Sequence, residues 1–149
     1  MNKKTLIKIV VLTDFFIILD QATKFLAQNN LKEPFFITSF FSFYYSENHG
    51  IAWSIPVPKY IILILTTIFL LLIPLYLYNK VKNNSVLSQV VIAMFCAGAI
   101  SNLIDRLFFG FVRDFISIGT FPVFNFADAF ICTSVFLIIV FYDRITGYN

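Results

Sequence analysis

Four long apolar stretches run through the chain, and each is predicted to form a helix that crosses a membrane. The clearest covers residues 60–78, YIILILTTIFLLLIPLYLY, and contains no charged side chain. At about 1.5 Å of rise per residue, a helix of that length spans a hydrocarbon layer roughly 30 Å thick. The other three stretches cover residues 86–106, about 126–142 and, less uniformly, about 6–27.

The first stretch has a second interpretation, because MNKK followed by apolar residues is also typical of a cleaved signal peptide. Asp14 and Asp20 interrupt the apolar run, which the core of a signal peptide rarely allows. We therefore expect this segment to be retained as the first helix. Within the stretch at 86–106, Ala93, Ala97 and Ser101 are spaced four residues apart, a pattern suited to close helix packing.

Basic residues are distributed unevenly around the four spans. They gather before and in the first helix, between the second and third, and after the fourth: Lys3, Lys4, Lys8, Lys80, Lys82 and Arg144. Because positively charged loops face the cytoplasm, both termini are expected inside. Residues 28–58 and 108–125 are then expected outside.

The outer segment at residues 35–55, FFITSFFSFYYSENHGIAWSI, is rich in aromatic and β-branched residues and contains a turn-like ENHG. This pattern predicts a small hairpin or sheet at the membrane surface. The expected fold class is therefore an all-α membrane protein. It would be one integral membrane domain over residues 1–149, with four transmembrane helices and a small periplasmic β-rich platform.

Composition supports a lipid environment, because 13% of the residues are charged whereas a soluble domain has about 25%. The net charge of +3 is too small and too scattered to indicate a nucleic-acid partner. Cys96 and Cys132 both fall in apolar runs and are expected to be small buried side chains. The cysteines and the single histidine form no ligand cluster, so neither a metal nor another cofactor is expected.

Polar residues gather near the outer ends of the predicted spans. Asp20 and Lys24 are four residues apart, in the order that favours an ion pair on one helix face. Asn102, Asp105 and Arg106 are expected to share a face of the third helix, where Asp105 and Arg106 would provide charge partners for each other in a structural role. Asn48 and Gly50 lie in the outer hairpin, and Asn125 lies three residues before Asp128.

Asp114 and Asp128 are the two acids without an obvious partner. Arg113 adjoins Asp114, but adjacent residues of an extended segment point to opposite faces. Two carboxylates held close together do not both ionise easily, so one keeps a proton. Such a pair can activate water as a base and protonate a leaving amide nitrogen as an acid, which is peptide hydrolysis without a metal.

Other chemistries stay open at this point. A serine–lysine dyad with Lys24 is conceivable, whereas a serine triad is not expected, because Ser54 and Ser101 are given no nearby histidine partner and His49, the single histidine, lies in the outer loop. A small proton or ion carrier would distribute its acids through the bilayer, whereas here Asp14 alone lies near mid-span. A structural assembly protein would need no unpaired acids. Other intramembrane aspartyl proteases carry G-x-G-D, and Asp114 follows Val112 and Arg113 instead.

The motifs, taken together, resemble the lipoprotein signal peptidase family, also called signal peptidase II. Five segments carry the resemblance in order: DQATK (20–24), ENHGIAWS (47–54), AGAISNLIDR (97–106), GFVRDFI (110–116) and FNFADAFI (124–131). They are similar to the family's N-x-G-x-A-F-S, G-G-A-x-G-N-x-x-D-R, G-x-V-x-D-F-I and F-N-x-A-D-x-x-I blocks and to its first conserved block. Trp53 stands where phenylalanine is usual, and Ala97 and Ser101 stand where glycine is frequent.

The resemblance implies an aspartic endopeptidase of the bacterial inner membrane. It would be multi-pass, with its active site near the periplasmic face. Its partners would be membrane lipid and diacylglyceryl-modified prolipoproteins, cut just before the lipidated cysteine, and a monomer is expected. Asp114 and Asp128 would form the catalytic pair. The residues implied to line or support the site are Asp20, Lys24, Asn48, Gly50, Asn102, Asp105, Arg106 and Asn125.

Overall fold

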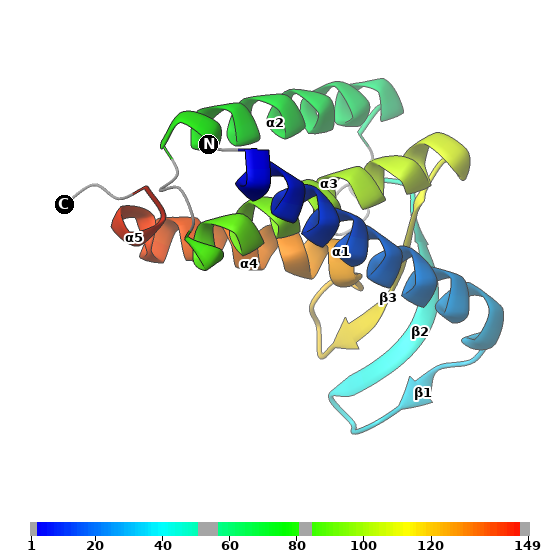
Figure 1. Cartoon of the computed structure of the whole chain (residues 1–149). Helices are drawn as coiled ribbons and strands as arrows, with labels where there is room; N and C mark the ends of the chain where they lie inside the picture. Colours follow the sequence, from blue (N-terminus) through cyan, green and yellow to red (C-terminus); the bar gives the residue numbers. More distant parts are fainter. Residues whose placement is uncertain (1–2, 51–56, 81–84, 147–149) are drawn as a thin grey trace.

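The computed structural model describes residues 3–50, 57–80 and 85–146. The chain is mostly helical and has one small sheet (Figure 1). The helices are α1 (Lys3–Asn30), α2 (Lys59–Lys80), α3 (Val86–Phe108), α4 (Phe126–Val140) and α5 (Tyr142–Thr146). The strands are β1 (Phe35–Phe36), β2 (Phe41–Asn48) and β3 (Val112–Ile118).

Helix α3 is the central element, and α1, α2 and α4 all pack against it. Ala93, Ala97 and Ser101, the predicted small-residue stripe, are completely buried. Gly98 brings α3 closest to α4, since a Cβ atom there would lie 2.4 Å from the Ala127 carbonyl oxygen. The prediction of close packing along this stretch is therefore confirmed.

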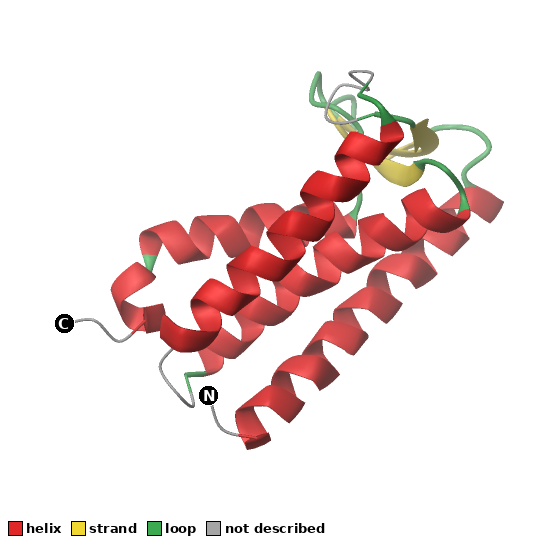
Figure 2. Cartoon of the chain, turned by 90° about the horizontal axis from the view of Figure 1, so that it is seen from above, coloured by secondary structure: helices red, strands yellow, loops and turns green. Residues whose placement is uncertain are grey.

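The sheet lies at one end of the helices, and the first turn of α1 and the short helix α5 lie at the other (Figure 1, Figure 2). All strand pairs are antiparallel, in the order β1-β2-β3. The register pairs Phe43 with Ile116 and Ser46 with Asp114, with a bulge between them. The predicted outer hairpin is thus confirmed for β1 and β2. Its last residues, 51–55, lie outside the described part of the chain.

Strand β3 was not predicted as a third strand, although its segment was expected to be extended. Val112, Phe115 and Ile116 are buried in it, and Phe115 and Ile116 pack with Ala27 of α1. Helix α1 and the sheet therefore enclose a small apolar core of their own. This packing holds β3 against the ends of α1 and α3, where the predicted polar residues gather.

The outward faces of the helices are strongly apolar. Ile18 of α1, Leu71 of α2 and Ile139 of α4 are 67%, 64% and 73% exposed. Within the described residues, α3 is the one helix that is both long and apolar enough to cross a membrane, and Tyr60–Tyr76 and Phe126–Val140 are shorter apolar helices. An apolar surface of this extent suits a lipid environment.

Candidate active site

Helix α4 begins inside the candidate site, and its first turn fixes one of the two acids. The Oδ1 atom of Asn125 accepts a hydrogen bond from the backbone N–H of Asp128 at 2.9 Å. The backbone N–H of Asn125 donates in return to Oδ2 of Asp128 at 3.3 Å. This reciprocal capping box turns the Asp128 side chain back over the start of the helix.

The other acid, Asp114, lies in the middle of β3 and is 2% exposed. The Nδ2 group of Asn125 donates to its Oδ1 atom at 2.6 Å, and that of Asn48 donates to Oδ2 at 3.0 Å. Asn48 is itself oriented, because its Oδ1 atom accepts from the backbone N–H of Gly50 at 3.1 Å. The structure therefore brings the side chains of β2, β3 and α4 to one point.

Asn102 of α3 completes the setting of the two acids. Its Nδ2 group donates to Oδ1 of Asp128 at 2.7 Å. Its Oδ1 atom accepts from Lys24 Nζ at 2.9 Å and from Asn125 Nδ2 at 3.3 Å. Asn125 thus contacts both acids, and Asn102 connects Asp128 to the side chain of Asn125.

Burial raises the pKa of Asp114 from 3.8 to about 7, and the neighbouring charge of Asp128 adds to the rise. The hydrogen bonds from Asn48 and Asn125 act in the opposite direction but do not offset these effects. Asp114 therefore holds a proton up to near-neutral pH. A protonated acid beside a second carboxyl group is the arrangement that general acid–base chemistry requires.

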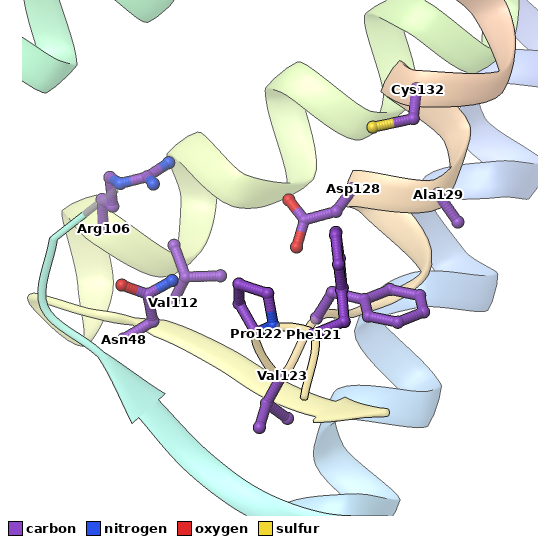
Figure 3. Close-up of a pocket in the computed structure, with 10 residues that line it drawn as sticks. Asn48, Arg106, Val112, Phe121, Pro122, Val123, Asp128, Ala129 and Cys132 are labelled. Atoms are coloured by element: carbon purple, nitrogen blue, oxygen red, sulfur yellow. The ribbon is translucent and has the colours of Figure 1, made fainter. Parts of the chain in front are cut away.

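A cavity of about 460 Å³ opens beside Asp128, and Figure 3 shows the side chains around it. Asn48, Arg106 and Asp128 point into the same space from β2, α3 and α4. The rest of the lining is mainly apolar: Val112, Phe121, Pro122, Val123, Phe124, Ala129 and Cys132. A second cavity of about 390 Å³, between α2, α3 and α4, also reaches Arg106 and Asp128.

Behind the acids lies a buried cluster of four charges. Lys24 Nζ is 2.7 Å from Asp20 Oδ2 and 3.3 Å from Asp105 Oδ2, so the predicted pair of Asp20 and Lys24 is confirmed. Arg113 Nη2 is 2.7 Å from Asp105 Oδ1. Two cations and two anions therefore balance in this cluster. Asp20 also accepts from the backbone N–H of Ala127 at 2.8 Å, which ties α1 to the start of α4.

The expected pairing of Asp105 with Arg106 is wrong. Asp105 is turned toward Lys24 and Arg113, whereas Arg106 lines the cavity with Asp128 and forms no ion pair within the described residues. Adjacent residues of an α-helix point about 100° apart, so these two side chains cannot share a face. Arg106 is thereby left facing the two acids.

Three residues of this region were missed by sequence reasoning: Gln21, Ser101 and Arg113. Gln21 Nε2 donates to Ser101 Oγ at 2.9 Å and to Asp105 Oδ1 at 3.0 Å. The place of Arg113 could have been inferred, because successive side chains of a strand point to opposite faces. With Asp114 on one face of β3, Arg113 points to the other face, toward the helices. Cys132 was expected to be buried but is exposed, because it lies one turn after Asp128 on the face of α4 that borders the cavity.

The geometry also bears on the serine–lysine alternative. Ser101 Oγ donates to Asp20 Oδ2 at 2.6 Å rather than to Lys24. Lys24 is completely buried, and its ammonium group contacts oxygen atoms of Asp20, Asp105 and Asn102. Ser101 and Lys24 are therefore each directed to other partners, and the geometry does not support a serine–lysine dyad.

Comparisons with known proteins agree with this arrangement. The family model described as signal peptidase (SPase) II matches residues 12–143. A lipoprotein signal peptidase of Clostridium tetani is 37% identical over 142 residues, which cover 89% of this chain and 90% of the relative. One of Clostridium novyi is 33% identical over 143 residues, covering 91% and 97%.

A solved bacterial membrane enzyme, determined by the in meso method at 1.9 Å resolution, is similar to this chain with a TM-score of 0.78 and 32% identity. The similarity covers 90% of this chain and 91% of that enzyme. Sequence and fold thus agree over nearly the full length of both proteins. On these matches, the chain belongs to the signal peptidase II family.

Proposed function

We propose that this protein is an aspartic endopeptidase that removes signal peptides from diacylglyceryl-modified prolipoproteins, cleaving just before the lipidated cysteine. The family and the names of its relatives support the substrate class. The observation that carries the catalytic assignment is that Asn125 bonds both Asp114 and Asp128 at the edge of an apolar cavity. No cofactor is required by this chemistry.

In the proposed reaction, Asp128 is the base and Asp114 is the acid. Asp128 takes a proton from a water molecule that attacks the scissile carbonyl carbon, while Asp114 donates its proton to the carbonyl oxygen. Asp128 then protonates the amide nitrogen as the carbon–nitrogen bond breaks, and the hydroxyl proton of the intermediate returns to Asp114. The raised pKa of Asp114 supports a pair that holds one proton, and the reaction balances equally if the two acids exchange roles.

Arg106 is proposed to stabilise the singly protonated pair. Two ionised acids beside one guanidinium group would leave an excess negative charge in a poorly hydrated place. One shared proton makes the set of Asp114, Asp128 and Arg106 electrically neutral. Arg106 borders both cavities that reach Asp128, so it also lies where a substrate would pass.

The two apolar cavities suit a substrate that is itself apolar. Thr66, Phe69, Ile131 and Val135 belong to the lining of the cavity between the helices. A hydrophobic signal peptide, or an acyl chain beside the scissile bond, would remove this surface from contact with water or lipid. The meeting of both cavities at Asp128 supports a scissile bond held at that point.

We further propose four membrane spans in one integral domain, corresponding to α1, α2, α3 and α4, in the bacterial inner membrane. The first turn of α1 and α5 lie at the end of the helices away from the sheet, which supports cytoplasmic termini and an active site near the periplasmic face (Figure 1). The sheet would then be the periplasmic platform. The protein is proposed to act as a monomer with membrane lipid around it.

The direct test is cleavage of a synthetic prolipopeptide whose cysteine carries diacylglycerol. Purified protein in detergent or lipid should release the signal peptide, with mass spectrometry locating the cut immediately before the modified cysteine. The matched control is the same peptide with an unmodified cysteine, for which we expect cleavage at least about tenfold slower. An intact lipidated peptide after prolonged incubation would contradict the proposal.

A further inference from the structure

Arg113 takes no part in the proposed chemistry, yet it is 3% exposed and connects three elements. We propose that Arg113 is a positioning residue for both catalytic acids, acting on Asp114 through strand β3 and on Asp128 through the buried charge cluster. The proposal rests on the proposed function. It adds a role that the sequence left unassigned.

Each nitrogen of the Arg113 guanidinium group donates a hydrogen bond. Its Nη2 group donates to Asp105 Oδ1 at 2.7 Å and to Gln21 Oε1 at 2.7 Å, and its Nε group donates to Asp105 Oδ2 at 3.3 Å. Nη1 lies 3.4 Å from Gln28 Oε1, and the guanidinium carbon lies 4.2 Å from the centroid of the Phe109 ring. A planar guanidinium that binds one carboxylate through two nitrogens has a single orientation.

The first route runs along the strand. The backbone N–H of Arg113 also donates to Asp105 Oδ2 at 3.0 Å, so both the backbone and the side chain at this position are tied to α3. Adjacent residues of a strand point to opposite faces. Anchoring Arg113 on the helix side therefore directs Asp114 toward Asn48 and Asn125.

The second route runs through the charges. Asp105 is shared by Arg113 and Lys24, and Lys24 in turn donates to Asn102, which donates to Asp128. With Arg113 present, the two acids of the cluster are matched by two bases. Without it, Asp20 and Asp105 would share Lys24 alone. Lys24 would then be drawn toward the acids and away from Asn102, and the orientation of Asp128 would weaken.

The test compares Arg113→Gln and Arg113→Lys with the parent enzyme on the lipidated prolipopeptide. For Arg113→Gln we expect kcat per folded molecule to fall roughly 10- to 100-fold with KM within about threefold, since small displacements of reacting groups cost this much. Arg113→Lys keeps the charge and should recover part of the loss. Arg144→Gln is the matched control, because Arg144 is an exposed arginine on α5 and should leave kcat unchanged.

If Arg113→Gln does not fold, the double variant Arg113→Gln with Asp105→Asn restores charge balance. We expect it to regain folded protein while kcat stays low, because the link between β3 and α3 is still missing. Parental kcat in whichever of these variants folds would overturn the proposal, since a residue that only stabilises the fold changes the amount of folded enzyme and not its kcat.

A second readout does not depend on activity. If the parent protein fails to cleave the peptide, the proposed function fails, but the role of Arg113 is still scored by thermal unfolding between pH 4 and pH 8. Because Arg113 also contacts Asp105, this comparison is made in an Asp105→Asn background, in which that carboxyl group no longer titrates. Released from its anchor, Asp114 would become hydrated, and the pH dependence that its burial produces should flatten when Arg113→Gln is added. A slope equal to that of Asp105→Asn alone would overturn the inference about Arg113.

Discussion

At the scale of single residues, Asn48, Asn102 and Asn125 all direct amide N–H groups at the two acids. Each amide is itself oriented by a further hydrogen bond: Asn48 by Gly50, Asn102 by Lys24, and Asn125 by the backbone of Asp128. Amide donors stabilise a carboxylate without adding a second charge. The acids can therefore be held close together in a buried place while one of them stays protonated.

The raised pKa of Asp114 makes folding dependent on pH. The folded state binds this proton up to about pH 7, whereas the unfolded chain releases it near 3.8. Stability is therefore greatest below about pH 4 with respect to this group and falls as pH rises to 7. The full shift corresponds to at most about 4 kcal/mol, of which we expect about 1–3 because relaxation around the charged form recovers part of the cost.

Asp114→Asn removes this titration. Thermal or denaturant unfolding in detergent should show the variant equal to the parent at pH 4 and about 1–3 kcal/mol more stable at pH 8. The Asn48 amide can rotate to accept from the new NH2 group, but its Oδ1 atom then gives up the bond from the backbone N–H of Gly50, which offsets part of the gain. A variant that is less stable than the parent at pH 8 would mean that Asp114 is ionised in the folded protein.

Lys24 and Arg106 are expected to respond differently to removal of their charge. Lys24→Met leaves Asp20 and Asp105 buried with one cation between them, at a cost of about 3–5 kcal/mol. Arg106→Gln should cost less than about 1 kcal/mol, because Arg106 borders a cavity and has no ion pair among the described residues. Folded yield and unfolding temperature of the two variants check this difference.

The cleavage activity of Arg106→Gln complements its stability. Folded Arg106→Gln should lose cleavage by at least about tenfold, since its charge faces the catalytic pair. This outcome differs from the sequence-based expectation that Arg106 has a structural role as the charge partner of Asp105, because loss of such a partner would reduce the amount of folded protein. Loss of folded Arg106→Gln to the same extent as Lys24→Met would restore that earlier interpretation.

At the scale of elements, the site depends on how closely α3 and α4 approach. A Cβ atom on Gly98 would lie 2.4 Å from the carbonyl oxygen of Ala127 and 2.7 Å from Cγ1 of Ile131. Ala127 directly precedes Asp128 in the first turn of α4. Any displacement of α4 at this contact therefore moves the Asp128 carboxyl group, which is one of the two proposed catalytic acids.

Gly98→Ala should destabilise the protein by about 1–3 kcal/mol through overpacking and reduce kcat roughly 100-fold by displacing Asp128. Adding Ile131→Ala removes the side-chain contact but leaves the shorter contact with the backbone carbonyl. The double variant should therefore stay impaired. Restored kcat in the double variant would show that Ile131, rather than the backbone of α4, sets the distance between the helices.

Helices α2 and α3 could be predicted well from the sequence because their apolar stretches are long. The stretches at 60–78 and 86–106 correspond to Lys59–Lys80 and Val86–Phe108. The third strand could not, because VRDFISI is buried on both faces and lacks the alternation of a half-exposed strand. Its partner, β2, is also distant in sequence.

In the site, too, contacts within one helix could be predicted from the sequence, whereas contacts between distant elements could not. All ten predicted residues lie in or beside one hydrogen-bonded region, and the pair of Asp20 and Lys24 follows from helix spacing alone. The partner of Asp105 could not be found this way, because Arg113 reaches it only after β3 docks on α3. Gln21 was overlooked for a similar reason, since its partners Ser101 and Arg113 come from other elements.

At the scale of the whole molecule, the sheet lies at one end of the helices and α5 at the other (Figure 1). The polar network lies at the end with the sheet, because Asp114 of β3 and Asn48 of β2 belong to it. Asp14, between the two ends, is exposed. Acids that carried protons across a membrane would be distributed along the helices. The concentration of polar groups at one depth instead suits chemistry at a membrane surface.

The difference between the two ends of the molecule predicts which segments lie on each side of the membrane. Reporter domains fused after Thr146 and inserted at residues 81–84, which lie outside the described part of the chain, should both be cytoplasmic. A reporter inserted at Ser39, between β1 and β2, should be periplasmic. Paired reporters active on only one side of the membrane check all three positions. A periplasmic signal from either of the first two fusions would contradict the four-span topology.

The central claim is that Asp114 and Asp128 act together in hydrolysis. Asparagine matches aspartate in size but cannot take or supply the catalytic proton, so Asp114→Asn and Asp128→Asn should each lower cleavage by at least about 1000-fold. The double variant should be no worse than either single variant, because the two acids act as a unit. Asp14→Asn is the matched control and should cleave normally.

The most direct measurement is single-turnover cleavage of the lipidated prolipopeptide by these four variants, each first shown to be inserted in the membrane and folded. We expect product from the parent protein and from Asp14→Asn, and none above background from Asp114→Asn, Asp128→Asn or the double variant. Cleavage by Asp114→Asn or Asp128→Asn within about tenfold of the parent rate would contradict the assignment of these two acids as the catalytic pair.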